Sequence, residues 1–298
     1  MITNKFWREL SKICDYTRDI SLNDKTTIKI GGTTPAFIIP SNRTEFCAVI
    51  ELCDICNVDY RILGAGSNVL IGDGAVKYVV ISTERLNKCY INRLGFVYAE
   101  AGLKICKLIQ FATKNGLAGL EYLIGVPGSV GGAVVMNAGA FGVEIGNFVE
   151  YVDVWDGAKV IRLENDKLFF EYRHSIFTNS KKYAIIGVGF WLAKDSSDSI
   201  LRRTQYAIQA RADTQRVGFA SAGSVFRKTA EFAPAYMIEA CELKGKTIGG
   251  AQISQIHSGY IVNLGSATCQ DVIKLIELVR KTVGEKFGVA LELEIILL

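Results

Sequence analysis

The sequence predicts an α+β fold in two parts, and three observations support that prediction. The chain has 298 residues, a length at which a single hydrophobic core usually stops growing and the chain divides. Short apolar runs typical of strands dominate residues 26–192, with a few helical patterns among them. The polar stretch Lys194–Asp198 ends this pattern, and helical patterns dominate after it. We therefore expect one domain over residues 1–195 and a second over residues 196–298.

The first part is expected to be rich in strands. Strands are predicted within residues 26–39, around Gly31 and Gly32. Apolar residues at helical spacing predict a helix over residues 44–56 and another over Leu103–Asn115, which ends before a typical C-terminal glycine, Gly116. Alternating apolar residues predict the remaining strands at Tyr60–Leu63, Tyr78–Ile81, Val97–Ala101, Tyr151–Trp155, Val160–Leu163 and Tyr183–Leu192.

The second part is expected to contain three helices and a final strand. The polar stretch caps a helix that runs to about Ala212, and Ala233–Cys241 forms another. Thr268 and Asp271 resemble a capping box at the start of a long helix with an apolar stripe. Val289–Leu298 is predicted to be an apolar strand that contains Glu294. Glu294 either faces solvent at an alternate position or is buried, and a buried charge is costly unless it is paired.

Composition excludes several classes of protein. The 34 basic and 30 acidic residues give a net charge of +4, which is too weak and scattered for nucleic acid but suits an anionic small ligand. No apolar run reaches the roughly 18 residues of a membrane span, and the first residues do not form a signal peptide. The eight cysteines lack framework spacing, and we expect reduced thiols in a cytoplasmic protein. Cys53 and Cys56 predict a helix with buried cysteine and no metal site, since only two histidines are available.

Two glycine-rich segments predict a phosphate-binding function. The first is Leu63–Asn68, directly after a predicted strand, and the second is Gly125–Ala133, followed by Asn137–Gly142. Glycines let successive backbone amides turn toward an anion, and serine and asparagine side chains add donors. One such loop could be a simple turn, but two favour a pyrophosphate. The Rossmann fingerprint and the P-loop do not fit these segments, so we expect a dinucleotide held by a strand-rich domain of another type.

Three residues could carry chemistry, although each has an ordinary explanation when taken alone. Arg173 lies between aromatic neighbours and could be a surface arginine that packs on a ring. Ser224 follows a glycine and could be a turn hydroxyl; the sequence around it lacks a nucleophile elbow, which argues against a serine hydrolase. Glu294 could face solvent.

Together, segments spread over most of the chain closely resemble the UDP-N-acetylenolpyruvoylglucosamine reductase family. The matching segments are Thr26–Gly32, Leu63–Asn68, Gly125–Gly132, Asn137–Ala140, Tyr172–Phe177, Ser221–Ser224, Leu243–Lys246, Ile248–Ile253, Ile261–Asn263 and Leu291–Glu294. The resemblance implies an FAD-binding domain of the vanillyl-alcohol oxidase type in two subdomains, and a C-terminal α+β substrate-binding domain whose last strand could pack back on the FAD domain.

The resemblance also implies a reaction and a role for each matching residue. NADPH reduces FAD, and the enolpyruvyl ether of UDP-N-acetylglucosamine then takes a hydride and a proton to give UDP-N-acetylmuramate. Arg173 stabilises the enolate-like charge, Glu294 assists it, and Ser224 donates the proton, so the three are expected to lie together at the flavin. The residues expected to bind FAD are Gly64, Gly66, Ser67, Asn68, Gly125, Gly128, Ser129, Gly131, Gly132 and Asn137.

The resemblance is incomplete at the diphosphate contacts. Arg227, Lys228 and Gln252 are expected to contact the UDP-sugar, but Lys228 stands where the family usually has asparagine. Arg173 and Ser224 lie too close in sequence to hold the extra tyrosine-bearing loop of the longer form, so the chain resembles the shorter form. Two alternatives stay open: an FAD-dependent oxidase or dehydrogenase of another hydroxyl-bearing substrate, and a non-catalytic flavin- or nucleotide-binding module. No nucleic acid, membrane or obligatory protein partner is expected.

Overall fold

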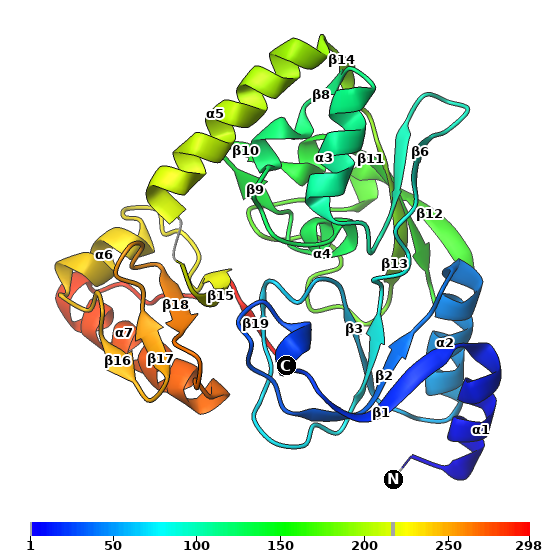
Figure 1. The fold of residues 1–298 in the computed structure, drawn as a ribbon, viewed down its shortest axis with the longest axis horizontal. Helices are drawn as coiled ribbons and strands as arrows, with labels where there is room; N and C mark the ends of the chain where they lie inside the picture. The colour runs from blue at the N-terminus through cyan, green and yellow to red at the C-terminus, as the bar shows by residue number, and fades with distance from the viewer. Residues whose placement is uncertain (1, 216–217) are drawn as a thin grey trace. The chain divides into compact units, whose positions relative to one another are not determined.

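The computed structural model describes residues 2–215 and 218–298, which form two compact units built from separate stretches of the chain (Figure 1). Unit 1 consists of the chain up to Arg18, Ala36–Ala65 and Lys77–Ala210. Unit 2 consists of Asp19–Pro35, Gly66–Val76 and Arg211–Leu298. The chain therefore passes between the units several times, and one of these passages, from Ala65 to Gly66, falls within the first glycine-rich loop.

A four-stranded sheet with two helices belongs mostly to unit 1, apart from the residues of its first two strands that fall within Asp19–Pro35. Its strand order is β1 (Asp15–Ser21), β2 (Thr33–Ile39), β5 (Val79–Ser82) and β3 (Tyr60–Leu63), and the pairs that β5 forms with β2 and β3 are parallel. α1 (Asn4–Ile13) and α2 (Arg43–Ile55) share one core with these strands. That core includes Phe6, Leu10 and Phe46, all fully buried.

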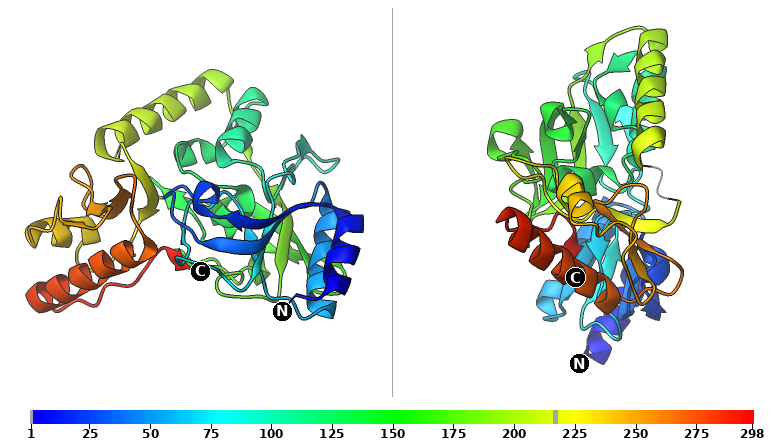
Figure 2. Two further views of the ribbon diagram at one scale, coloured as in Figure 1. Left: turned by 60° about the horizontal axis from the view of Figure 1, so that its bottom comes forward. Right: turned by 90° about the vertical axis from the view of Figure 1, so that its left-hand side faces the viewer.

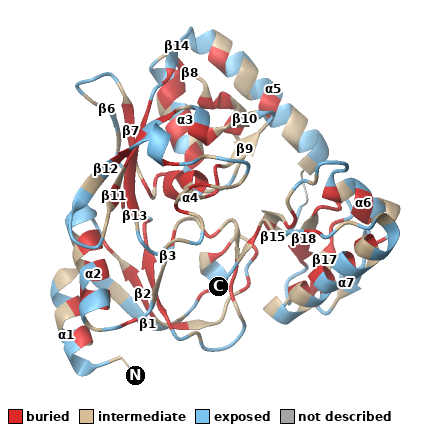
Figure 3. Cartoon of the chain, turned by 180° about the vertical axis from the view of Figure 1, so that it is seen from behind, coloured by how far each residue is buried: buried red, intermediate tan, exposed pale blue. Residues whose placement is uncertain are grey.

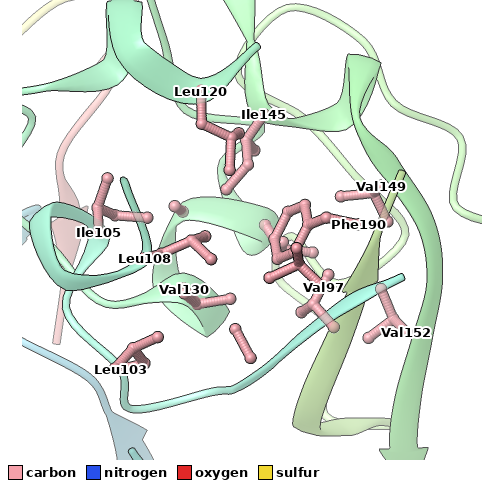
Figure 4. Close-up of a cluster of buried hydrophobic side chains, with 14 of the residues drawn as sticks. Val97, Leu103, Ile105, Leu108, Leu120, Val130, Ile145, Val149, Val152 and Phe190 are labelled. Carbon is pink, nitrogen blue, oxygen red and sulfur yellow. The ribbon is translucent and has the colours of Figure 1, made fainter. Parts of the chain in front are cut away.

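A five-stranded antiparallel sheet forms the rest of unit 1. Its order is β12 (Val160–Glu164), β11 (Val149–Trp155), β13 (Ala184–Phe190), β7 (Val97–Glu100) and β6 (Cys89–Ile91). α3 (Ile105–Lys114) and α4 (Val130–Val135) pack their apolar sides into the core of this sheet (Figure 4). The shorter elements of unit 1 are β8 (Leu117–Ala118), η2 (Leu120–Leu123), β9 (Gly139–Ala140), β10 (Val143–Glu144), η3 (Ile145–Asn147), η4 (Asn165–Lys167) and β14 (Ala193–Lys194).

Two glycines of β13 let tyrosines lie flat on the sheet. Gly189 is paired with Tyr151 of β11 and with Tyr98 of β7. A Cβ atom at Gly189 would overlap the Tyr151 ring, and one at Gly187 would overlap the Tyr98 ring. Both tyrosines are consequently buried, at 3% and 8% exposure, although they are not part of the core on the helix side of the sheet.

We expect Gly189→Ala to lower the free energy of unfolding by about 1–3 kcal/mol, because the new methyl group must displace the Tyr151 ring from its packed position. Gly284→Ala is the matched control, and it should raise the free energy of unfolding instead of lowering it. Gly284 lies inside the long helix α7 (Cys269–Phe287), where a Cβ would meet only the Val289 carbonyl oxygen at 3.9 Å, so alanine should add about 0.5–1 kcal/mol. Urea denaturation of the two variants measures both effects; equal midpoints for Gly189→Ala and the parent protein would contradict the first.

Unit 2 is a four-stranded antiparallel sheet with helices on one face (Figure 2). The order is β15 (Ala220–Ser224), β18 (Tyr260–Asn263), β17 (Ala251–Ile253) and β16 (Thr247–Ile248). α6 (Pro234–Ala240) and α7 share a core with the inward residues Ala251, Ile253 and Ile261. The remaining elements are η1 (Asn23–Lys25) and the parallel pair of β4 (Val69–Leu70) with β19 (Ile296–Leu297).

α5 (Ser197–Gln215) runs from unit 1 into unit 2, since the boundary falls at Ala210 and Arg211. Most of its surface is exposed, and Ile200 and Ala207 are its buried residues (Figure 3). In unit 1 it is fixed by Arg203, whose Nε lies 2.6 Å from Oε1 of Glu121. Glu121 is 3% exposed, and a buried carboxylate requires such a partner.

Most predicted helices and strands are confirmed within a few residues. Gly116 has a φ of 63°, as expected after α3, and Thr268 and Asp271 form the capping box of α7. Cys53 is fully buried on α2, and burial raises the pKa of its thiol to about 12. Among the described residues no group of histidine, cysteine or acidic side chains is arranged for a metal ion, and no helix there has the length and apolar character to cross a membrane.

Two predicted strands are wrong in part. Residues 26–32 form a turn, because the Thr26 hydroxyl both accepts from the Ile30 amide and donates to the Ile30 carbonyl, and Lys29 has a φ of 60°. Residues 289–298 do not form one continuous strand: Leu293 makes a single bridge with Phe226, and β19 forms only at Ile296–Leu297. α1 and β1 were not expected at all.

Candidate active site

The first glycine-rich loop leaves β3 in unit 1 and continues into unit 2 at Gly66. In unit 2, Gly66 has a φ of 63°, and its carbonyl accepts from the Thr27 amide at 3.0 Å. A Cβ at Gly66 would collide with the Lys25 carbonyl. Only glycine fits this combination of left-handed backbone and close approach.

The second glycine-rich loop leads into α4. Gly125 and Gly128 both have positive φ angles, of 78° and 152°. Ser129 is the N-cap of α4, and its hydroxyl accepts from the Gly132 amide at 3.4 Å. The Gly131 amide donates to the Ala101 carbonyl at 2.8 Å. The amides of Gly131 and Gly132 therefore hold the loop in shape from within.

The two loops touch each other inside unit 1. A Cβ at Gly64 would collide with the Ser129 hydroxyl, so the missing side chain at Gly64 is what allows the loops to come together. Ser129 is 2% exposed, whereas Gly125 and Gly132 lie at the surface. Unit 1 thus presents bare loop backbone, which is the type of surface that a pyrophosphate requires.

Asn137 joins three segments of unit 1. Its side-chain amide donates to Glu144 Oε2 at 2.7 Å and to the Glu171 carbonyl at 2.9 Å, and its Oδ1 accepts from the Gly146 amide at 3.0 Å. Asn137 is 1% exposed and has a φ of 41°. Its side chain therefore makes its hydrogen bonds inside the protein, and we interpret Asn137 as a residue that positions its neighbours.

We expect Asn137→Ala to lower the free energy of unfolding by roughly 2–4 kcal/mol, because it leaves buried donors and acceptors without their partner. Asn87→Ala is the control, since it removes one exposed hydrogen bond to the Glu84 carbonyl and should change stability by less than about 0.5 kcal/mol. Urea denaturation measures both variants, and equal losses would show that Asn137 has no special structural role.

Arg173 is held in a tight turn of unit 1. The amide of Glu171 donates to the His174 carbonyl and the amide of His174 donates back, at 3.1 and 3.0 Å. Arg173 has a φ of 53°, an uncommon value for a residue with a side chain, and such strain often marks a functional position. Its guanidinium is 16% exposed and lies 3.8 Å from Glu144.

The Arg173 guanidinium is oriented by backbone oxygens. Nη1 donates to the Asn137 carbonyl at 3.4 Å and Nη2 donates to the Gly139 carbonyl at 3.1 Å. The planar fork of arginine suits two acceptors at fixed positions. Unit 1 thus holds a permanent cation, mostly buried, at the segment that follows the second glycine-rich loop.

Ser224 ends β15, next to an irregularity in the sheet. β15 pairs with β18 through Ala220–Asn263 and Ser221–Val262, and then again through Ser224–Tyr260, with a register shift between. Gly223 lies within this bulge and has a φ of 79°. Bulges of this kind redirect a side chain and are frequent near active sites. Ser224 is consequently placed opposite Tyr260.

Glu294 lies beside Ser224 in unit 2. The Glu294 amide donates to the carbonyl of Val225, the residue after Ser224, at 2.8 Å. Its own carbonyl accepts from the Asn68 side-chain amide at 3.0 Å, and the Asn68 carbonyl accepts from Ile296 at 2.9 Å. Three residues predicted from the sequence, Asn68, Ser224 and Glu294, are thus brought together within one unit.

The predicted substrate-binding residues also belong to unit 2. The Arg227 amide donates to the Glu292 carbonyl at 2.9 Å, which places Arg227 in the ladder that holds Glu294. Lys228 is exposed. Gln252 lies on β17 opposite Val262, and its side chain donates to the Thr247 hydroxyl at 3.0 Å. By this register, Gln252 and Tyr260 share the sheet face opposite α6 and α7.

Comparisons with known proteins agree with this arrangement. Residues 34–162 match the family described as FAD binding domain, and residues 215–298 match the C-terminal domain of UDP-N-acetylenolpyruvoylglucosamine reductase. A reductase of that name from Thermosipho melanesiensis is 41% identical over 282 residues, which are 93% of this chain and 95% of the relative. The chain belongs to the UDP-N-acetylenolpyruvoylglucosamine reductase family.

Other members of this reductase family are similarly close. The relative from Clostridium novyi is 39% identical over 292 residues, 97% of this chain and 94% of that protein. The crystal structure of the reductase from Thermus caldophilus has a TM-score of 0.80 and 31% identity, and it covers 95% of this chain and 98% of that one. These matches confirm the predicted family, the α+β fold class and FAD as the cofactor.

Sequence reasoning missed Tyr260, the cross-strand partner of Ser224, and Arg211, which lies near Tyr260. Tyr260 lies opposite Ser224, and the hydroxyl of Tyr260 donates to Oε1 of Gln215 at 3.4 Å. Arg211 is close enough to Tyr260 to influence its ionisation. Tyr260 begins an apolar strand and reads as a core residue, so only the strand pairing reveals its relation to Ser224.

Proposed function

We propose that this chain is an NADPH-dependent flavoenzyme that reduces the enolpyruvyl ether of UDP-N-acetylglucosamine to UDP-N-acetylmuramate, a step in the synthesis of peptidoglycan precursors. The observation that carries the proposal is the backbone hydrogen bond from Glu294 to Val225, the residue after Ser224, beside Asn68, in a chain of this reductase family. A serine and a carboxylate next to a glycine-rich loop are the groups that this reduction requires.

The glycine-rich loops fit FAD. The loops meet where the Ser129 hydroxyl occupies the space that a side chain at Gly64 would need. We assign the pyrophosphate region to the first loop, Gly64–Asn68, and to Gly125–Ser129 of the second. Gly131, Gly132 and Asn137 contribute by fixing the shape of unit 1, since their polar groups bond internally. The chemistry that FAD supplies when bound is transfer of a hydride from NADPH to the enolpyruvyl methylene carbon.

Arg173 stabilises the charge that the hydride creates. Addition at the methylene carbon pushes electrons toward the substrate carboxylate and gives an enolate-like species. A guanidinium carries a permanent positive charge, and two carbonyl oxygens orient that of Arg173 before the substrate arrives. We assign to Glu294 an assisting role at the same charge.

Ser224 completes the reduction by donating a proton to the second carbon of the enolpyruvyl group. A hydroxyl is a weak acid, so its placement matters more than its acidity. The bulge at Gly223 and the pairing with Tyr260 provide that placement.

Arg227, Lys228 and Gln252 bind the UDP-sugar. Two of the three are cations, which suits the negative charge of a diphosphate. Lys228 and Gln252 retain exposed surface for a ligand, and Gln252 shares a sheet face with Tyr260. We place the reaction in the cytoplasm, in agreement with eight free cysteines, and infer that it serves cell-wall growth and therefore cell shape and division.

Two successive mixing experiments test the proposed function. The purified protein is loaded with FAD and mixed with NADPH under anaerobic conditions, which should bleach the flavin absorbance. A second mixing with the enolpyruvyl nucleotide should restore that absorbance and yield UDP-N-acetylmuramate. A protein that binds no flavin, or a reduced flavin that reacts with oxygen but not with the nucleotide, would overturn the proposal; the second result would favour an oxidase on the same fold.

A further inference from the structure

Tyr260 lies directly across the sheet from Ser224. The two residues are paired in the antiparallel ladder of β15 and β18, where the Cβ atoms of opposite residues are about 4.5–5.5 Å apart. The Ser224 side chain is close enough to the Tyr260 hydroxyl to lower the pKa of Tyr260 by hydrogen bonding. The amide that follows Ser224, that of Val225, donates to the Gly259 carbonyl at 3.0 Å. The backbone thus fixes both residues of the pair.

Polar and charged groups surround the Tyr260 hydroxyl from several elements of unit 2. Gln215 accepts a hydrogen bond from this hydroxyl at 3.4 Å. The positive charge of Arg211, on α5, lowers the pKa of Tyr260, and the negative charge of Glu294 raises it. The His257 ring contacts the Tyr260 ring edge-on, with centroids 4.8 Å apart. Burial raises the pKa of Tyr260, while Arg211 and the hydrogen bond with Ser224 oppose that rise.

We propose that Tyr260 is a positioning residue for the reduction, which aims the Ser224 hydroxyl and returns a proton to it; this inference rests on the proposed function. As Ser224 protonates the second carbon, its O–H bond breaks and a C–H bond forms. The Tyr260 O–H, which donates to Gln215 before the reaction, then turns to the Ser224 oxygen and transfers its proton there. The negative charge of the enolate ends on the Tyr260 oxygen beside Arg211, and solvent water restores the phenol.

The relative acidities of the two hydroxyls favour this direction of proton movement. A tyrosine hydroxyl has an ordinary pKa of about 10 and is a stronger acid than a serine hydroxyl, so a serine alkoxide takes a proton from tyrosine readily. The permanent positive charge of Arg211 favours the phenolate that results. Without Tyr260, Ser224 would have to wait for water to reach it.

Tyr260→Phe tests the inference, because it removes the hydroxyl and keeps the ring. We expect reduction of the flavin by NADPH to be unchanged and reoxidation by the enolpyruvyl nucleotide to slow by about 10- to 100-fold. The KM for the nucleotide should change little, and the solvent deuterium isotope effect on reoxidation should increase. Tyr236→Phe is the control, since Tyr236 lies exposed on α6 of the same unit, and it should behave as the parent enzyme.

A double variant separates positioning from a general structural role. In the Ser224→Ala background, Tyr260→Phe should cause no further loss, because its partner is already absent. Additive losses, equal losses in both half-reactions, or a parent-like rate for Tyr260→Phe would each overturn the inference. The parent enzyme is assayed in parallel: if it fails to react with the nucleotide, the proposed function fails, whereas a normal parent rate confines any failure to Tyr260.

Discussion

Ser224→Ala is expected to leave reduction of the flavin by NADPH intact and to slow reoxidation by the enolpyruvyl nucleotide by about 10²- to 10⁴-fold, the usual contribution of a general acid. The reason is that Ser224 is the only hydroxyl that the bulge at Gly223 places beside Glu294 among the described residues of β15. Alanine fits the strand, so the fold should be retained.

Stopped-flow absorbance measures both half-reactions of this variant separately. Ser221→Ala is the matched control, since Ser221 lies on the same strand and the contact that Thr27 makes there is to the Ser221 carbonyl, which the substitution keeps. The control should react as the parent enzyme does. A Ser224→Ala enzyme that loses both half-reactions to the same extent would show that Ser224 supports the structure instead of donating a proton.

The fold was predictable where local signals decide it. The capping box of α7 and the glycine after α3 mark helix ends with groups that satisfy the backbone locally. The errors lie where distant residues decide. Residues 26–32 are folded into a turn by the Thr26 hydroxyl, and the last residues are divided between Phe226 and β4. An apolar pattern cannot show which neighbour a segment will pair with.

The sequence predicted which residues belong to the candidate site, but it did not predict which of them lie next to each other. The resemblance to a family drew attention to Ser224 and Glu294, yet only the ladder at Val225 shows that they are neighbours. Tyr260 escaped notice because a tyrosine at the start of an apolar strand is usually a core residue. In the same way, the sequence could not show that the side chain of Asn137 is fully used inside unit 1.

Arg173→Lys is expected to cause the second large loss of activity. Lysine keeps the positive charge but lacks the planar guanidinium, which donates hydrogen bonds in two fixed directions. One ammonium group cannot reach both the Asn137 and Gly139 carbonyls in the geometry that Nη1 and Nη2 now have. The cation would then be mobile when the enolate-like charge develops. Loss of one oriented donor usually costs about 10²- to 10³-fold in rate, and we expect this loss in reoxidation by the nucleotide alone.

Arg162→Lys provides a control for the general cost of replacing arginine in this unit. Arg162 stacks on a tyrosine, with its guanidinium carbon 3.5 Å from the centre of the Tyr151 ring, and pairs with Asp153, but it has no part in the proposed chemistry. Both variants should bind FAD and accept hydride from NADPH at the parent rate. If Arg173→Lys reacts with the nucleotide as fast as Arg162→Lys does, charge alone is sufficient, and the strained turn at Arg173 has another purpose. If only Arg173→Lys is slow, the reduction depends on the direction in which the guanidinium points, which its carbonyl partners determine.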